Sequence, residues 1–383
     1  MRGFNSLRRL QFIGPATFGF VDDGGKGNFN QVTSMYSNTG MASEPAPPTI
    51  SFAARAAGES ALDRFNRIRR VRFGNLWTPI ERIDRLRRLI PGAPHLYIKR
   101  DDLTGYCGGG NKLRKLEYTM ADARAKGATT VITTGSITSN LARTAALVAR
   151  RMGLKCVLVL NGGDPQKARA NARITDLLGV EVHAVATRAD RDRRMNEIAA
   201  TLATRGERVY QIPLGASNEI GSFGMVAAME EIGIQQLELG EQFDWVVFAT
   251  SSGGTQAGLE AGRRLFGYHH LQLLGISADD PAADIKQSIR LALDPMLSRL
   301  GLPDFGKQDE LSVDDRFVGP GYGVPTPESE EAGRLLADAE GILLDPVYTS
   351  KAAAGLISYC REGLFNATDR VLFWHTGGVM TLL

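Results

Sequence analysis

Short apolar runs alternate with amphipathic segments along the chain from about residue 70 onward. The apolar runs are rich in β-branched residues and have the length of buried strands, which we expect at residues 95–99, 129–134, 155–160, 181–186, 209–213, 245–249, 271–277 and 370–375. The segments between them repeat apolar residues three and four positions apart, which predicts helices at 111–124, 139–152, 166–178, 190–205, 217–237, 256–266 and 328–340. This alternation is typical of an α/β protein with mostly parallel sheets.

The composition is that of an ordinary globular protein of 383 residues, with 43% hydrophobic and 23% charged residues. The formal net charge is +3 and the two signs are interspersed, so we expect no nucleic-acid partner. There is no apolar run of about 18 residues, so we expect no membrane span. Cys107, Cys156 and Cys360 are too scattered for a disulfide framework or a zinc site, so we expect free thiols and no metal.

The N-terminal 55 residues differ in composition from the rest of the chain. They contain the stretches DDGGKGN and SEPAPP, which are typical of disordered segments. Arg2, Arg8 and Arg9 precede the first acidic residue, as in an organellar presequence, although a tag or an overlong gene start fits equally well. We therefore expect residues 1–55 to be a disordered, targeting or tag extension. The protein is expected in the cytoplasm, or in an organelle such as the mitochondrion.

Four glycine-rich segments follow or adjoin the expected strands, namely GYCGGGNK (105–112), TTGSITSN (133–140), ATSSGGTQAG (249–258) and WHTGG (374–378). In parallel sheets, ligands bind at the carboxyl ends of strands, where free amides at a helix N-terminus attract an anion. The third segment combines hydroxyl side chains with glycines that allow close backbone approach, which suits a phosphate group. It has neither the ending of a Walker loop nor the spacing of a Rossmann fingerprint.

A lysine, Lys112, stands at the start of an expected helix in GGGNKLRK. Nearby amides and the positive helix end lower the pKa of an amine, as a Schiff-base lysine requires. Taken alone, a glycine-rich turn is more often a plain connection, and a lysine at a helix start is more often a solvated charge. Their presence together favours a functional site.

A set of motifs occurs in the order found in one enzyme family. They are TPIERID (78–84), IKRDDLTGYCGGGNKLRKLEY (98–118), SN (139–140), SSGGTQAGL (251–259), GYGVPT (321–326), DPVYTSKAAAGL (345–356) and HTGG (375–378). Together they resemble the family of D-cysteine desulfhydrase and 1-aminocyclopropane-1-carboxylate (ACC) deaminase, which are fold type II enzymes that depend on pyridoxal 5′-phosphate (PLP). The resemblance implies an enzyme that acts on a small amino acid.

The resemblance also implies a tryptophan-synthase-β-like fold, in which PLP lies in a cleft between two α/β domains. We expect a larger PLP-binding domain at residues 56–113 and 226–383. A smaller α/β domain is expected at residues 114–225 and would close over the substrate. Fold type II relatives are usually homodimers, and a homodimer is expected here.

The resemblance assigns roles to individual residues around the cofactor. Lys112 would form the Schiff base with PLP and move the proton at the substrate Cα. Asn140 would bind the phenolic oxygen of the cofactor. Ser139 would contact the substrate carboxylate and could act in catalysis as a nucleophile or proton carrier. The cofactor phosphate would be held by Ser251, Ser252, Gly253, Gly254 and Thr255.

Three further residues complete the implied site. Tyr322 and Tyr348 match tyrosines that flank the substrate, and one phenol would carry a proton for the leaving group. Outside the resemblance, both tyrosines are better interpreted as core aromatics with a satisfied hydroxyl. Thr376 would lie near the pyridine nitrogen of the cofactor.

Three positions bear on the choice of reaction. The deaminases have Glu where this chain has Thr349 and Leu where it has Thr376, and neutral hydroxyls beside the ring favour β-elimination, with D-cysteine giving pyruvate, sulfide and ammonia. ACC deamination is the alternative. Leu141 replaces the usual His or Gln, which leaves open a biosynthetic β-elimination or β-replacement enzyme with a larger substrate. A non-catalytic protein that binds PLP or a metabolite is the alternative outside the enzymes.

Overall fold

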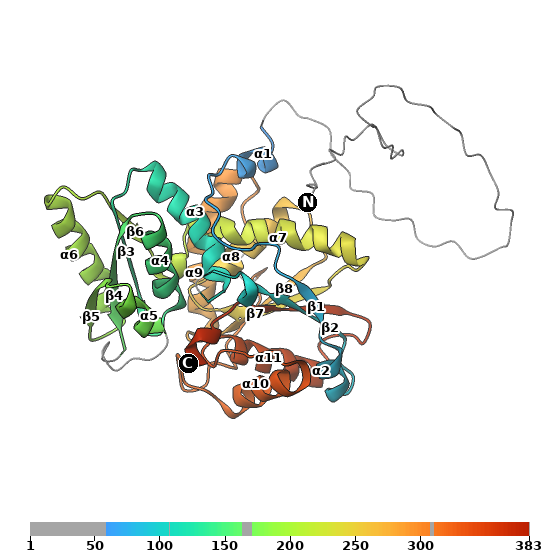
Figure 1. Cartoon of the computed structure of the whole chain (residues 1–383). Coiled ribbons are helices and arrows are strands. Elements are labelled where there is room, and N and C mark those ends of the chain that lie inside the picture. Colours follow the sequence, from blue (N-terminus) through green and yellow to red (C-terminus); the bar gives the residue numbers. More distant parts are fainter. Residues whose placement is uncertain (1–58, 107, 163–170, 307–309, 383) are drawn as a thin grey trace, which may run out of the picture. The chain divides into compact units, whose positions relative to one another are not determined.

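The computed structural model describes residues 59–106, 108–162, 171–306 and 310–382 (Figure 1). The N-terminal extension expected at residues 1–55 and the thiol of Cys107 lie outside the described residues. Within these ranges, no helix is both long and apolar enough to cross a membrane.

The larger of two sheets has six strands in the order β1-β2-β10-β7-β8-β9. β1 runs antiparallel to β2, and the other neighbouring strands are parallel. The strands are β1 (Ile80–Arg82), β2 (His95–Arg100), β7 (Trp245–Thr250), β8 (Gln272–Ser277), β9 (Val313–Asp314) and β10 (Arg370–His375).

The smaller sheet has four parallel strands in the order β5-β4-β3-β6. They are β3 (Thr130–Ser136), β4 (Lys155–Asn161), β5 (Glu181–Val185) and β6 (Val209–Ile212). α6 covers one face, where Ile132 and Val159 pack with Ile198. α4 covers the other face, where Val131 packs with Ala145.

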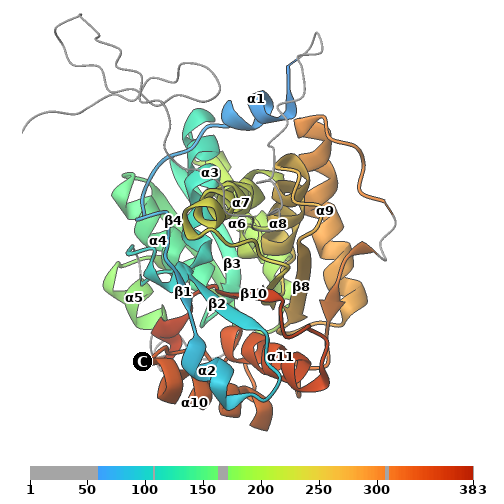
Figure 2. The ribbon, with the colours of Figure 1, turned by 90° about the vertical axis from the view of Figure 1, so that its right-hand side faces the viewer.

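Helices connect the strands and cover both sheets. Their bounds are α1 (Ala61–Asn66), α2 (Asp84–Leu89), α3 (Asn111–Ala125), α4 (Asn140–Arg151), α5 (Asn171–Leu177), α6 (Asp190–Thr204), α7 (Glu219–Leu239), α8 (Gly254–Leu265), α9 (Ala282–Leu300), α10 (Pro327–Glu340) and α11 (Thr349–Glu362). α2, α10 and α11 lie on one side of the larger sheet, and α7 and α8 lie on the other (Figure 2).

Strand β10 shows why the strands of the larger sheet are continuous apolar runs. Val371 and Phe373 are buried in the core against α10 and α11, whereas Leu372 and Trp374 are buried against α7. Because helices cover both faces, alternate residues are apolar on each side. The packing accounts for the absence of a polar alternation in this strand.

All eight expected strands are present, with ends shifted by at most two residues. The expected helix at 166–178 is observed over Asn171–Leu177 in the described residues. β1 and β9 were not predicted, because strands of three and two residues carry almost no periodic signal. The strands of the smaller sheet fall within 114–225 and those of the larger sheet fall outside it. We propose that this is the boundary between two domains.

Candidate active site

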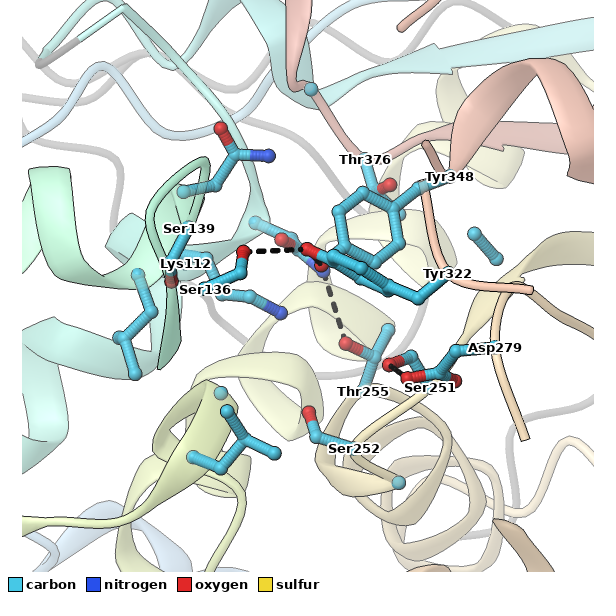
Figure 3. Close-up of a pocket in the computed structure, with 18 of the residues that line it drawn as sticks. Lys112, Ser136, Ser139, Ser251, Ser252, Thr255, Asp279, Tyr322, Tyr348 and Thr376 are labelled. Atoms are coloured by element: carbon cyan, nitrogen blue, oxygen red, sulfur yellow. Dashed lines mark hydrogen bonds between the residues drawn. The ribbon is translucent and has the colours of Figure 1, made fainter. Parts of the chain in front are cut away.

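A cavity lies at the carboxyl ends of parallel strands from both sheets, where ligands bind in folds of this class (Figure 3). Its wall brings together ten of the eleven site positions predicted from the sequence, namely Lys112, Ser139, Asn140, Ser251, Ser252, Gly253, Thr255, Tyr322, Tyr348 and Thr376. Gly254 is not part of the wall. As the first residue of α8 it packs against Lys115 and Ser217.

Lys112 is the second residue of α3 and follows three glycines with positive φ. Gly109 requires this conformation, because a Cβ there would lie 1.9 Å from the carbonyl oxygen of Asp102. The glycine turn thus places the lysine in the cavity wall. Burial lowers the pKa of the Lys112 amine to about 8, against the opposing attraction of the Asp279 carboxylate. A neutral, nucleophilic amine is therefore accessible near neutral pH.

The loop of residues 251–255 connects β7 to α8 at the opposite wall. Gly253 has a φ of 79°, and a Cβ there would lie 2.7 Å from the backbone nitrogen of Ile289, so the loop sits tightly on α9. Gly253 is also the N-cap of α8, and no side chain caps this helix. The N-terminus of α8 therefore presents free amides and the positive end of its dipole to the cavity.

A second lysine, which was not predicted from the sequence, lies behind this loop. Lys115 is fully buried, and its Nζ donates hydrogen bonds to the Gly215 carbonyl oxygen at 2.8 Å and to the Ser217 hydroxyl at 2.9 Å. Burial and the charge of Lys112 hold the pKa of Lys115 well below its usual value, and no carboxylate in the described residues pairs with it. A buried ammonium without an anionic partner is costly, and a phosphate at the loop would supply that partner. The site therefore fits a phosphorylated ligand.

Two tyrosines form the part of the wall that faces the smaller sheet (Figure 3). The hydroxyls of Tyr322 and Tyr348 are 2.7 Å apart, and the Tyr322 hydroxyl is 3.1 Å from Ser136 Oγ. Burial, followed by the neighbouring Tyr322, holds the pKa of Tyr348 well above its usual value. Tyr348 is therefore a neutral phenol, and the three hydroxyls form a chain along which a proton can move.

Ser139 and Asn140 lie at the N-terminus of α4. Ser139 is the N-cap, and its hydroxyl accepts a hydrogen bond from the Ala142 amide at 3.2 Å. The Asn140 side-chain oxygen accepts a hydrogen bond from Asn171 at 3.0 Å, which leaves the amide nitrogen of Asn140 for a ligand. The neighbouring Leu141 is buried in the same wall and contributes no polar side-chain atom. Free amides and a hydroxyl at a helix N-terminus can bind a carboxylate.

The two threonines that bear on the choice of reaction differ in position. Thr376 lies in the cavity wall, and its carbonyl oxygen accepts a hydrogen bond from the Asn111 amide at 2.9 Å. Thr349 is fully buried outside the wall, and its hydroxyl donates to Asp345 Oδ1 at 2.7 Å. The structure thus places Thr349 outside the described cavity wall, and its position relative to the cofactor ring stays a prediction. Asp345 binds this hydroxyl and holds it at the start of α11.

Charged residues that were not predicted from the sequence also line the cavity. Ser251 donates to Asp279 Oδ2 at 2.8 Å, and burial raises the pKa of Asp279. Arg188 and Arg191 approach from the loop before α6 and from its first turn. The two arginines lie in the charge-rich segment RADRDRR. Its sequence pattern does not distinguish an arginine that lines a cavity from one that is exposed to solvent.

The sequence matches the model of a family described as pyridoxal-phosphate dependent enzyme over residues 71–377. The chain belongs to this family. It is 37% identical to D-cysteine desulfhydrase of Salmonella typhimurium over 330 residues, which cover 84% of this chain and 97% of the relative. The D-cysteine desulfhydrase of Salmonella typhi is also 37% identical, over 80% of this chain and 92% of the relative.

The solved structures agree with this assignment. A crystal structure of an ACC deaminase homologue superposes with a TM-score of 0.78 at 34% identity, over 85% of this chain and 97% of that chain. A threonine deaminase isoform from Solanum lycopersicum has a TM-score of 0.57 at 17% identity and shares the fold, over 80% of each chain. The predicted fold type II architecture and the dependence on PLP are thereby confirmed.

Because the chain belongs to the PLP-dependent family, the phosphate of PLP is the ligand that the phosphate site would bind. The cofactor supplies an electron sink for the substrate Cα when it is bound. Within this cavity, Lys112 is the amine that could hold it covalently, and the loop of residues 251–255 with Lys115 could hold its phosphate. Lys115 stands one helical turn after Lys112, so the i,i+3 spacing was the signal for it in the sequence.

Replacement of Lys115 by methionine is expected to weaken PLP binding about 10- to 100-fold, because a hydrogen-bonded charge at the phosphate is lost. Fluorescence titration of the apoprotein with PLP measures this change. The melting temperature of the apoprotein should not fall, since the lysine has no anionic partner in the described residues. Lys126→Met, at an exposed lysine after α3, is the control. An unchanged dissociation constant for Lys115→Met would remove Lys115 from the phosphate site.

Proposed function

We propose that this protein is a PLP-dependent lyase that catalyses β-elimination from a small amino acid, with D-cysteine as the first substrate to test. The observation that carries the proposal is that one cavity combines a low-pKa lysine, a phosphate site and a chain of hydrogen-bonded hydroxyl groups. The relatives at 37% identity are D-cysteine desulfhydrases, and β-elimination from D-cysteine gives pyruvate, sulfide and ammonia.

Binding and proton transfer at Cα are assigned to two parts of the cavity. Ser139 and the free amides of α4 bind the substrate carboxylate and so orient the Cα–H bond. Lys112 accepts the Cα proton, which its pKa of about 8 permits near neutral pH. Asn140 binds the phenolic oxygen of the cofactor through its amide nitrogen, and Asn171 holds the amide in that orientation.

Departure of the leaving group is assigned to the tyrosines. A sulfur leaving group needs a proton as the Cβ–S bond breaks, and a neutral phenol can donate one. Tyr322 contacts both Tyr348 and Ser136, so a proton given up at one hydroxyl can be replaced along the chain. The hydroxyl of Thr376 remains the neutral group proposed to lie near the pyridine nitrogen.

The test is to record the visible spectrum of the purified holoenzyme and then to add D-cysteine, L-cysteine and ACC separately. Sulfide and pyruvate from D-cysteine support the desulfhydrase proposal, and 2-oxobutyrate from ACC supports the deaminase alternative. A spectral change with no product from any of them would favour another substrate or a binding protein. β-Replacement is tested by adding a thiol or sulfide as a second substrate.

The pKa of Lys112 predicts how the apoprotein captures its cofactor. The neutral amine is the attacking form, so the rate of capture should rise with pH and level off above about 8. Stopped-flow absorbance after mixing apoprotein with PLP between pH 6 and 10 measures this profile. An exposed lysine analogue such as N-acetyl-lysine is the control, and its rate should still rise above pH 9. A protein profile that also rises past pH 9 would contradict the lowered pKa.

Assembly and location remain proposals. We propose a homodimer, which light scattering of the purified protein tests. The relatives are bacterial, and the comparisons give no support to an organellar location, so the cytoplasm is the proposed site of action.

A further inference from the structure

Arg191 is a buried cation in the cavity wall, and the proposed reaction leaves it without a role. Only 8% of its surface is exposed, although it lies in the first turn of α6. Its Nε donates a hydrogen bond to the carbonyl oxygen of Arg188 at 3.1 Å, and it forms no ion pair with a carboxylate in the described residues. The backbone thus holds the guanidinium in place, and the nearby carboxylates of Asp192 and Asp279 act on it only at a distance, without a hydrogen bond.

The neighbouring charges are already paired. Arg188 forms two hydrogen bonds with Asp280, at 2.9 and 2.6 Å, and Asp279 accepts the hydroxyl of Ser251 at 2.8 Å. Burial and the charge of Arg188 lower the pKa of Arg191, but a guanidinium stays protonated in proteins. Arg188 is therefore paired directly with a carboxylate, whereas Arg191 has no hydrogen-bonded carboxylate in the described residues.

Burial of a cation costs several kcal/mol unless an anion accompanies it, and such groups mark functional sites. Two anionic groups of the reacting system already have places in the cavity. The cofactor phosphate belongs at the loop of residues 251–255, and the substrate α-carboxylate belongs at the N-terminus of α4. Arg191 is therefore available for a third anionic group.

We propose that Arg191 binds an oxyanion at the far end of the substrate side chain. The preferred substrate is then an amino acid with a sulfonate or phosphate attached at Cβ, or with a carboxylate carried by a thioether on Cβ. This inference rests on the proposed lyase function and narrows its substrate class. Leu141 is consistent with it, because an apolar residue beside Ser139 cannot bind a distal anion, and that role then falls to a cation elsewhere in the wall, such as Arg191.

The reaction on such a substrate needs only water as a co-reactant. The Cα proton passes to Lys112, and the bond between Cβ and the leaving atom breaks with its electron pair on that atom. The leaving group is then sulfite, phosphate or a carboxylated thiolate. The 2-aminoacrylate that is released takes up one water molecule and gives pyruvate and ammonium.

The experiment compares substrates that differ in the distal charge. S-Carboxymethylcysteine is paired with S-methylcysteine, because both lose a thiolate, and cysteate is paired with cysteine, each as D and L forms. Pyruvate release gives kcat/KM, and the change in the visible spectrum of the holoenzyme gives the dissociation constant. The wild type is expected to prefer the anionic member by about tenfold or more. Arg191→Gln should lower kcat/KM and affinity for the anionic substrate about 10- to 100-fold. For the neutral substrate of each pair, both quantities should change less than about threefold.

Two variants serve as controls. Arg191→Lys keeps the charge and should retain part of the preference for the anionic member. Arg193→Gln, on the same helix, removes an arginine whose side chain is 67% exposed and paired with Asp190 and Glu197. It should change neither kcat/KM nor the dissociation constant for either substrate of a pair. The melting temperature of Arg191→Gln shows that it folds, since loss of an unpaired buried charge should not destabilise the apoprotein.

If Arg191→Gln lowered kcat/KM and affinity equally for the neutral and the anionic substrates, the proposal would be overturned, because Arg191 would then bind the α-carboxylate or support the fold. A wild type without any preference for the anionic member would overturn it as well. Addition of O-phosphoserine as a third anionic probe identifies which oxyanion fits. If no amino acid is turned over but binding of the anionic members depends on Arg191, the lyase proposal fails and the subsite stands. If neutral members are turned over and Arg191 has no selective effect, the subsite fails alone.

Discussion

Replacement of Lys112 by alanine should abolish turnover, with a fall in kcat of at least about 10³-fold, and should remove the visible absorption of the covalently held cofactor. Lys112 is the amine placed in the cavity by the glycine turn, and its pKa of about 8 suits both attachment and proton transfer. No other lysine lines the described wall of the cavity. Absorption between 300 and 500 nm and pyruvate release, measured on the same preparation, check both parts.

The variant should fold normally, because the removed side chain faces the cavity and contributes no salt bridge within the described residues. Its free energy of unfolding should change by less than about 1 kcal/mol. Lys126→Ala, at the exposed lysine after α3, is the matched control and should keep full activity and absorption. PLP should still bind Lys112→Ala non-covalently through the loop of residues 251–255 and Lys115. Retained turnover or retained covalent absorption would exclude Lys112 as the cofactor lysine.

The sheets could be predicted from the sequence because most of their strands are buried on both faces. Runs such as the one at β10 are apolar at every position, and the hydrophobic clusters of the structure explain this. The edge strands β1 and β9 are too short for a periodic pattern and were missed.

The cysteines were also predicted correctly where they can be tested. Cys156 and Cys360 are free thiols, and burial raises the pKa of each to about 12.

The members of the site could be predicted from motif order, but the direction of individual side chains could not. Thr349 follows Tyr348 directly in the sequence. Only the structure shows that the Thr349 hydroxyl donates to Asp345 outside the described cavity wall, whereas Tyr348 lines that wall. Arg191 is the opposite case. It lies in a charge-rich helix start that looks solvated in the sequence, and its burial arises from tertiary packing that no local pattern records.

Replacement of Ser139 by alanine should lower kcat/KM by about 10² to 10³-fold while PLP binding remains within about threefold of the wild type. The loss is expected because the Ser139 hydroxyl lies beside the amides that are proposed to bind the substrate carboxylate. The cofactor contacts assigned to Lys112, Lys115 and the loop of residues 251–255 are untouched. Steady-state pyruvate release and PLP titration separate the two effects.

The same change also removes a helix cap, and this must be separated from its effect on substrate. Loss of an N-cap costs about 1 kcal/mol of stability, and glycine at the position costs less than alanine. Ser139→Gly and Ser139→Ala should therefore differ in melting temperature but lose similar activity. Ser60→Ala removes the cap of α1, away from the cavity wall, and should lower stability without changing kcat/KM. If activity followed stability across these three variants, Ser139 would act only as a cap, and the carboxylate would have to bind elsewhere in the cavity.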